Sequence, residues 1–229
     1  MSEEMNSQLG TSDVNWNLND LYSGINDPEV VADMEGCERV ATVINGKYVD
    51  KVASLTAEEL LILVRSLEKL ETRLGSLATF AYLNFATQTK SAEAGAFLQK
   101  IREMGSRIGK QTVFFELEWS KVDDSIAQPL LEAPVLADYR HYLASMRRYA
   151  KHLLSPAEES LLIEKSPTGR SSWTTLFDKV MGNLQFGEQK RSEEEVLSDL
   201  YNPDRDIRKQ AAIDLTAGLR SQLHILTHI

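Results

Sequence analysis

The 229-residue sequence contains a single cysteine, Cys37. One cysteine cannot form an intramolecular disulfide, and it cannot supply a cysteine-rich zinc site. Such sparse use of cysteine is typical of proteins from a reducing compartment. Cys37 also lies on the apolar stripe of an expected helix. We therefore expect a small core residue there and not a reactive thiol.

Long hydrophobic runs are absent as well. No stretch approaches the roughly 20 apolar residues that a membrane-spanning helix needs. The opening MSEEMNSQLG is polar and acidic, with neither the basic start nor the apolar run of a secretory signal. We expect a cytoplasmic protein with no membrane partner.

Positive charge is in short supply. The chain has 25 Lys and Arg residues against 34 Asp and Glu residues, a net charge of −9. A nucleic-acid-binding protein normally shows a basic face or stripe, so no nucleic-acid partner is expected. The sequence also lacks the phosphate-binding and nucleophile motifs G-x-x-x-x-G-K-(S/T), G-x-G-x-x-G and G-x-S-x-G.

Glycine and proline are scarce, with 12 and 6 residues, and they fall mainly where helices would end. Together with abundant Leu, Ala, Glu and Arg, this predicts an all-α chain. Helix starts are marked by Asp27 before Pro28, by Thr56 with Glu59 three residues on, and by Ser155 before Pro156.

Apolar residues repeat with helical spacing in three long stretches, which predict the buried faces of three helices. The first face comprises Val30, Met34, Cys37, Ala41 and Ile44; the second Leu60, Leu63, Leu67, Leu70, Leu74, Leu77 and Ala81; the third Phe97, Ile101, Met104, Ile108 and Phe115. Because a short polar turn joins the last two, they are expected to form a long antiparallel helical hairpin. The fold prediction is a multi-helix array containing this hairpin.

Later segments carry breaks and further helices. A break is expected around Pro129 and Pro134, followed by a helix from about Leu136. A helix with Trp173, Leu176, Phe177 and Val180 should follow the SPTG loop. At most one short β-hairpin is predicted, near residues 183–191 with Gly187 in its turn. The remaining chain to Ile229 is predicted to be helical.

The last helix carries His224 and His228, four residues apart, a spacing that zinc peptidases use to hold their metal. The residue after His224 is Ile225, however, and not the general-base glutamate. Treated as one helix, the segment has an apolar stripe from Ile207 to Leu226, and both histidines fall opposite it. The favoured interpretation is two polar-face histidines; a weak adventitious metal site is the alternative, and a catalytic zinc site is disfavoured.

The segment YRHYLASMRRYAKHLL combines histidines, tyrosines and arginines. One interpretation is a cationic, aromatic surface for a peptide carboxylate or a phosphate, with Arg147, Arg148 and Tyr149 as contact residues. The favoured alternative is an amphipathic helix with an ordinary solvated face. The acidic run Glu193–Glu195 is interpreted as first-turn charge on a helix and not as a metal site. No catalytic residue is assigned.

Four segments, in order, resemble the N-terminal region of the oligoendopeptidase F family of zinc peptidases, relatives of thimet oligopeptidase. WNLNDLY resembles the family pattern W-(D/N)-L-x-D-L-Y, and YLNFATQT resembles its first helical hairpin. LSPAEESLLIEKSPTGRSSWTTLFDKV is similar to an L-S-x-x-E-E segment followed by a tryptophan. LSDLYNPDRDIRKQAA is similar to the L-x-x-x-D-R-x-x-R-x-x-A stretch that precedes the family's catalytic region.

The resemblance implies a part of a hydrolase that cleaves short peptides. In the family, a downstream H-E-x-x-H helix and a later glutamate hold zinc, and the glutamate of the motif activates water. This sequence contains no H-E-x-x-H, so no catalytic or zinc residue carries over. We therefore expect no cofactor in this chain and zinc in the full-length enzyme. The chain would then be a truncated, inactive fragment that forms a lid over the substrate channel.

Three regions are expected: a polar disordered leader at 1–15, an N-terminal helical lid at 16–130, and a helical segment at 131–229 that leads into a catalytic domain. The expected partners are an oligopeptide substrate and that catalytic domain, which Arg147, Arg148, Tyr149, His224 and His228 could contact. An undocked apolar surface could also drive self-association. Two other functions stay open: a stand-alone helical interaction module, and a small metal-dependent hydrolase built on the two C-terminal histidines.

Overall fold

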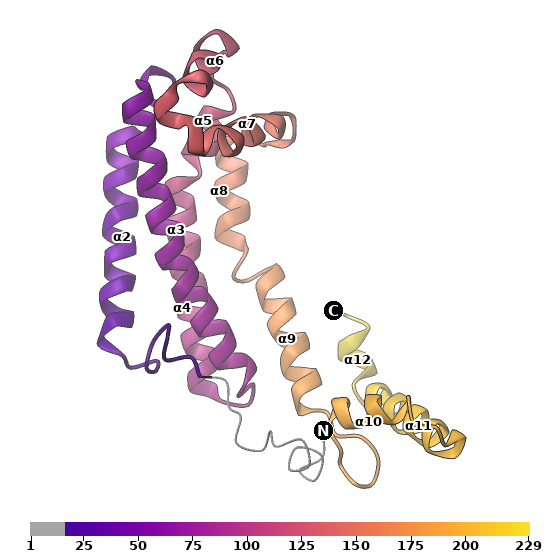
Figure 1. Ribbon diagram of the computed structural model, residues 1–229. Coiled ribbons are helices and arrows are strands. Elements are labelled where there is room, and N and C mark those ends of the chain that lie inside the picture. The colour runs from indigo at the N-terminus through magenta and orange to yellow at the C-terminus, as the bar shows by residue number, and fades with distance from the viewer. Residues whose placement is uncertain (1–16) are drawn as a thin grey trace. The chain divides into compact units, whose positions relative to one another are not determined.

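The computed structural model describes residues 17–229, so the leader predicted at 1–15 lies outside the described residues (Figure 1). The described chain consists of helices and connecting turns, and the predicted all-α class is confirmed. It divides into two compact units. We call residues 18–87 with 92–169 the hairpin unit, and residues 170–229 with Asn17 and 88–91 the C-terminal unit. The domain boundaries predicted at residues 15 and 130 stay predictions.

The hairpin unit is built on three long helices that pack alongside one another, α2, α3 and α4 (Figure 1). The α3–α4 pair is the antiparallel hairpin that the sequence predicts. In chain order the elements are α2 (Pro28–Tyr48), the 3-10 turn η1 (Val52–Ser54), α3 (Ala57–Ala86), α4 (Ala92–Thr112), α5 (Phe114–Trp119), α6 (Asp124–Glu132), η2 (Pro134–Tyr139), α7 (Arg140–Arg148), η3 (Ala150–His152) and α8 (Pro156–Lys165).

The predicted helix starts are confirmed by their capping contacts. The Asp27 carboxylate accepts a hydrogen bond from the Glu29 N–H, at 2.9 Å, with Pro28 in the first turn. Thr56 and Glu59 form a complete capping box, and Ser155 forms another with its own glutamate at the start of α8. These contacts satisfy N–H groups that the helix itself leaves without acceptors.

The core of the hairpin unit follows the three apolar stripes. Met34 and Leu74 are partly buried, and the other stripe residues are buried. Aromatic rings close one part of the core: Tyr22 and Phe97 each meet Phe80 edge-on, with ring centroids 5.3 and 6.0 Å away. Tyr22 also donates its hydroxyl to Asp33, at 2.9 Å, and thereby fastens the segment before α2 to that helix.

Two local expectations are wrong. Pro129 does not break the chain, because it lies inside α6, and the helix ends only before Pro134. Only one intrahelical hydrogen bond is lost at Pro129, a cost that a short helix packed on its neighbours can sustain. Phe115 belongs to α5 and not to the preceding long helix, since α4 ends at Thr112 and Val113 forms a turn between the two helices.

The C-terminal unit has a much smaller core. Its helices are α9 (Arg170–Asn183), α10 (Glu193–Asp199), α11 (Arg205–Ser221) and α12 (Leu223–Leu226). Among the described residues of this unit, three apolar side chains are fully buried: Phe186, Val196 and Ala211. Phe186 and Arg191 form an isolated antiparallel bridge around the positive-φ Gly187, at the place where the sequence allows a short hairpin.

The sequence pattern suggests one continuous helix at the end of the chain. In the structure this helix is interrupted, because α11 ends at Ser221. The Ser221 hydroxyl donates to the Gly218 carbonyl at 2.7 Å and competes with the next backbone bond. Gln222 then leaves helical geometry and bonds back to Leu219 in a tighter turn. His224 therefore lies in α12 and His228 lies beyond its end. The expected single stripe opposite both histidines does not exist.

Adjacent positions of α3 test the packing of the hairpin unit. Leu63 is fully buried, whereas the side chain of Ile62 is 54% exposed. We predict that Leu63→Ala lowers the free energy of unfolding by about 3 kcal/mol, because it removes buried methyl groups and leaves a cavity. Ile62→Ala is the matched control and should cost about 0.5 kcal/mol or less. Urea unfolding followed by circular dichroism measures both, and similar losses would contradict this packing.

Candidate functional site

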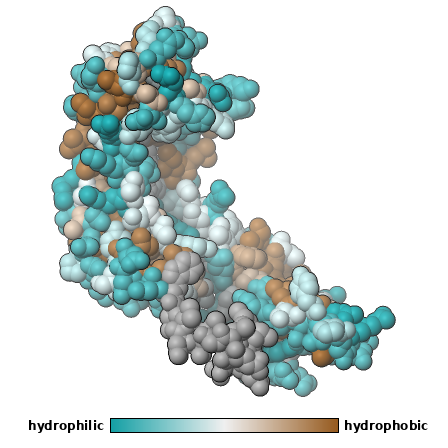
Figure 2. All heavy atoms as spheres, in the orientation of Figure 1, coloured by the Kyte–Doolittle hydropathy of each residue, from teal (hydrophilic) through white to brown (hydrophobic). Residues whose placement is uncertain are grey.

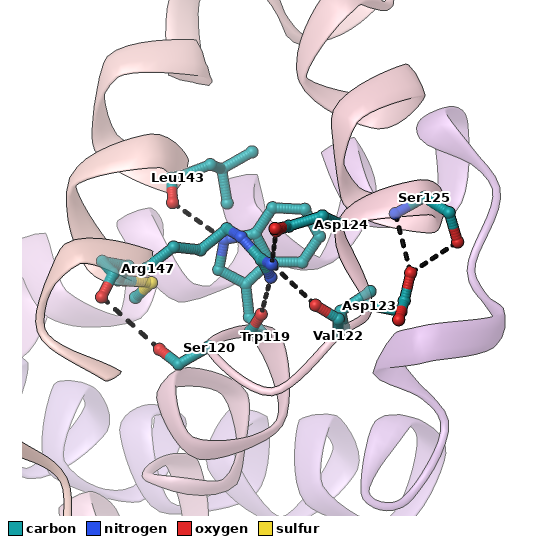
Figure 3. A network of polar contacts seen from close by, with 9 residues as sticks. Trp119, Ser120, Val122, Asp123, Asp124, Ser125, Leu143 and Arg147 are labelled. Atoms are coloured by element: carbon teal, nitrogen blue, oxygen red, sulfur yellow. Dashed lines mark hydrogen bonds and ion pairs between the residues drawn. The ribbon is translucent and has the colours of Figure 1, made fainter. Parts of the chain in front are cut away.

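Arg147 lies at the centre of a polar network at the end of α5 (Figure 3). Its guanidinium donates to the Trp119 carbonyl and the Val122 carbonyl, each at 2.7 Å, and to the Asp124 carboxylate at 2.6 Å. The side chain is 16% exposed. The last carbonyls of a helix have no intrahelical donor, and Arg147 supplies one to the end of α5.

Trp119 completes this network from the other side. Its indole ring is fully buried, and its N–H donates to the Leu143 carbonyl on α7 at 2.9 Å (Figure 3). The Arg147 guanidinium lies 5.6 Å from the ring centroid, in the range of a cation–π contact. The guanidinium thus makes two kinds of contact with its own chain. Its N–H groups donate to backbone and carboxylate oxygens, and its carbon lies over the Trp119 ring. The sequence prediction of a substrate or interdomain contact at Arg147 misses this internal role.

The neighbouring cap on α6 was also missed by the sequence analysis. The Asp123 carboxylate accepts hydrogen bonds from the backbone N–H of Ser125, at 2.8 Å, and from its hydroxyl, at 2.5 Å (Figure 3). These bonds hold the pKa of Asp123 below its ordinary value, with the hydroxyl as the larger cause. The signal was present in the sequence, since an Asp before a helical stretch is a common N-cap.

Arg148 and Tyr149 differ from Arg147. Both are exposed at the end of α7, and Tyr149 is 62% exposed. Arg148 forms no ion pair or side-chain hydrogen bond within residues 17–229. Of the three predicted contact residues in this segment, these two are therefore available to another molecule.

A second polar cluster holds the C-terminal unit together. Arg191 pairs with Asp199 on α10 and with Asp214 on α11, the latter at 2.9 Å. Burial lowers the pKa of the Arg191 guanidinium, but its hydrogen bonds to the two aspartates outweigh burial and raise it above the ordinary value. A surface hollow of about 1000 Å³ lies beside the cluster, with a lining of mixed polar and apolar residues. Since two carboxylates outnumber one guanidinium, the cluster is net negative and is not suited to bind an anion.

The two C-terminal histidines are exposed. His228 lies against the Trp173 ring of α9, with ring centroids 5.5 Å apart, whereas no partner is described for His224. Glu193–Glu195 form the first turn of α10, where Glu195 completes a capping box with Ser192. This confirms that the acidic run serves the helix start.

The residues present do not fit a catalytic zinc ion. Such a site needs three protein ligands as a rule. Over residues 17–229, no group of three or more His, Cys, Asp and Glu side chains is arranged to hold a metal. The sequence also contains no H-E-x-x-H.

Within residues 17–229, no helix is both long and apolar enough to cross a membrane.

Comparisons with known proteins relate part of this chain to one family of peptidases. The family model described as Oligopeptidase F matches residues 118–186, the region that contains the Arg147 network, α8 and α9. The oligoendopeptidase F homologue of Borreliella burgdorferi is 24% identical over 142 residues, which make up 60% of this chain. The chain is thus a distant homologue of oligoendopeptidase F, related to the N-terminal region of that family, and the resemblance predicted from the sequence is confirmed.

Solved structures share the fold. The crystal structure of oligoendopeptidase F from Enterococcus faecium superposes on 85% of this chain, with a TM-score of 0.66 and 20% identity. A Chlamydophila abortus protein described as a peptidase matches 92% of the chain, with a TM-score of 0.50 and 21% identity. The chain spans 24% of the Borreliella relative and 37% of each solved structure.

Arg147 and Arg148 provide a matched test of the polar network. We predict that Arg147→Lys lowers the free energy of unfolding by about 2 kcal/mol, because the single nitrogen of an ammonium group cannot take the places of the two guanidinium nitrogens that donate to the carbonyls. Arg148→Lys should leave stability within about 0.5 kcal/mol of the parent. Urea unfolding of the two variants decides the matter, and equal stability would show that the carbonyls do not depend on the guanidinium.

Gly187 tests the turn of the C-terminal unit. Its φ is +70°, and a Cβ atom there would lie 2.5 Å from an Asp214 carboxylate oxygen. We predict that Gly187→Ala destabilises the turn by about 1–3 kcal/mol. Hydrogen exchange at the Phe186 and Arg191 amides, which bond across the turn at 3.0 Å, measures the effect. The control is Gly75→Ala on α3, where a Cβ meets open space; unchanged protection in Gly187→Ala would refute the prediction.

Proposed function

We propose that this chain is the N-terminal, non-catalytic part of a zinc-dependent peptidase similar to oligoendopeptidase F. In this proposal the complete enzyme hydrolyses short peptides, and the helical array caps the substrate channel and excludes folded proteins. The chain alone would be inactive. Zinc and the residues that activate water would belong to a catalytic domain outside these 229 residues.

The observation that carries the proposal is the agreement of order and fold. The resemblance at the sequence level runs through four segments in family order, and the solved oligoendopeptidase F shares the fold over 85% of the chain. A stand-alone helical interaction module, the competing function, gives no reason for the D-R-x-x-R segment at Asp204–Arg208. Among residues 17–229, no three side chains are arranged to hold a metal ion. A metal-dependent hydrolase built on His224 and His228 is therefore not supported.

The surface of α9 supports a partner for the C-terminal unit. None of its 14 residues is fully buried, and Trp173 and Phe177 are 43% and 44% exposed. Apolar side chains gather at the surface over α9 in Figure 2. We propose that the catalytic domain covers this face, with His224 and His228 at its edge. Without that domain, the same face would favour self-association.

The DNA downstream of the codon for Ile229 tests this proposal. An in-frame H-E-x-x-H is the expected result, and an immediate natural stop codon would favour the interaction module.

A peptide-cleavage assay tests the same proposal biochemically. The 229-residue chain should not cleave a quenched fluorescent oligopeptide with or without added zinc. Cleavage that is abolished both by a chelator and by His224→Ala would refute the proposal in favour of the small hydrolase.

A further inference from the structure

The C-terminal end of α7 carries an unusual concentration of positive charge. Residues 139–152 contain four of the 25 Lys and Arg residues and two of the four histidines, but no Asp or Glu. The whole chain has a net charge of −9. A run with no acidic residue in such a chain stands out from the ordinary mixed-sign surface of a soluble domain.

Two of the four cationic side chains are occupied inside the hairpin unit. Arg147 binds the end of α5, and the Arg140 Nε donates to the Leu131 carbonyl at 2.6 Å. Arg148 and Lys151 have no ion pair or side-chain hydrogen bond among the residues that the structure describes. They are exposed, together with Tyr149 between them and His152 after them.

Helix stabilisation does not account for this group. Cations in the last turn of a helix interact favourably with its carbonyl end, but the effect fades within that turn. Arg148 is the last residue of α7, whereas Lys151 and His152 lie in η3 beyond the cap at Tyr149. The following helix start is also complete, because the capping box of Ser155 already serves it.

We propose that Arg148, Tyr149, Lys151 and His152 form a binding surface for the carboxylate groups of acidic oligopeptides. A guanidinium fork matches a carboxylate in bidentate geometry, and the ammonium of Lys151 adds a second donor. Tyr149, at 62% exposure, offers a ring to the peptide chain beside the charges. The choice of a peptide as the carrier of the carboxylate rests on the proposed function.

Neighbouring charges limit the surface to this end of α7. Burial raises the pKa of Tyr142, and the negative charges of Glu116 and Glu71 raise it further, so two acidic groups lie near that residue. A long polyanion would meet these carboxylates and the negative net charge of the chain. A short acidic peptide can contact the cationic end alone.

Fluorescence anisotropy with the 229-residue chain tests the proposal. The probes are a short labelled peptide with several Glu residues and its Gln counterpart, each with a free and an amidated C-terminus. The Glu peptide should bind about tenfold more tightly than the Gln peptide, since each exposed ion pair adds only a modest free energy. If instead the free peptide binds more tightly than the amidated one, the bound group is the C-terminal carboxylate of the peptide. Binding through either the Glu side chains or the C-terminus supports the proposal. Binding should weaken as the salt concentration rises from about 0.01 M to about 0.15 M, because the electrostatic screening length shortens.

Matched charge variants locate the surface. Arg148→Ala/Lys151→Ala should weaken Glu-peptide binding about fivefold or more. Lys69→Ala/Lys100→Ala makes the same charge change on exposed residues of the same unit and should have little effect. Circular dichroism checks that both variants fold. Equal losses in both variants, or no preference for carboxylates, would overturn the proposal.

Two further results would also overturn it: tighter binding of an oligonucleotide, or of vesicles rich in phosphatidylserine, than of the Glu peptide. The measurement involves no cleavage. Its outcome is therefore independent of whether an H-E-x-x-H follows in the gene, and the proposed function and this surface can fail separately.

Discussion

The apolar contact among α2, α3 and α4 is the interaction on which the rest of the hairpin unit depends. Each fully buried Leu, Ile or Phe side chain contributes about 1.5–3 kcal/mol relative to exposure, and the three stripes place many such residues in one seam. Polar contacts then fix the neighbours of that seam. The Glu118 carboxylate on α5 accepts from the backbone N–H groups of Asp50 and Val52, and Ser106 on α4 donates to Ile163 on α8.

The C-terminal unit is organised in the opposite way. With three fully buried apolar side chains among its described residues, it has little hydrophobic stabilisation of its own. Its order rests on the ion pairs of Arg191, on the left-handed Gly187 and on the close approach of Gly218 to the Phe186 ring. Helices of this length are marginal in water unless one face is packed. The exposed face of α9 is therefore the physical reason for the covering partner that we propose.

Much of the hairpin unit could be predicted from the sequence, because its signals are local and agree with one another. The stripes, Thr56 with Glu59, and Ser155 with Pro156 each specify a helix start or face without knowledge of the fold. The end of α11 could not be predicted in this way. It depends on a hydroxyl of Ser221 bonding to Gly218 in place of the backbone, a competition that helical periodicity does not reveal. Nor could the Arg191 pairs, because they join residues that only the fold brings together.

The same limit governs the candidate site. Arg147 and Arg148 are chemically identical neighbours, and both completed the basic pattern that indicated a binding surface. They differ in the direction in which α7 presents their side chains: Arg147 faces Trp119 and the end of α5, whereas Arg148 faces outward. A guanidinium that already serves two carbonyls and a carboxylate has few donors left for a ligand, and removing it would disturb the fold. Recognition at this end of α7 therefore falls to the residues whose donors the fold leaves unused, and the internal network holds them in position.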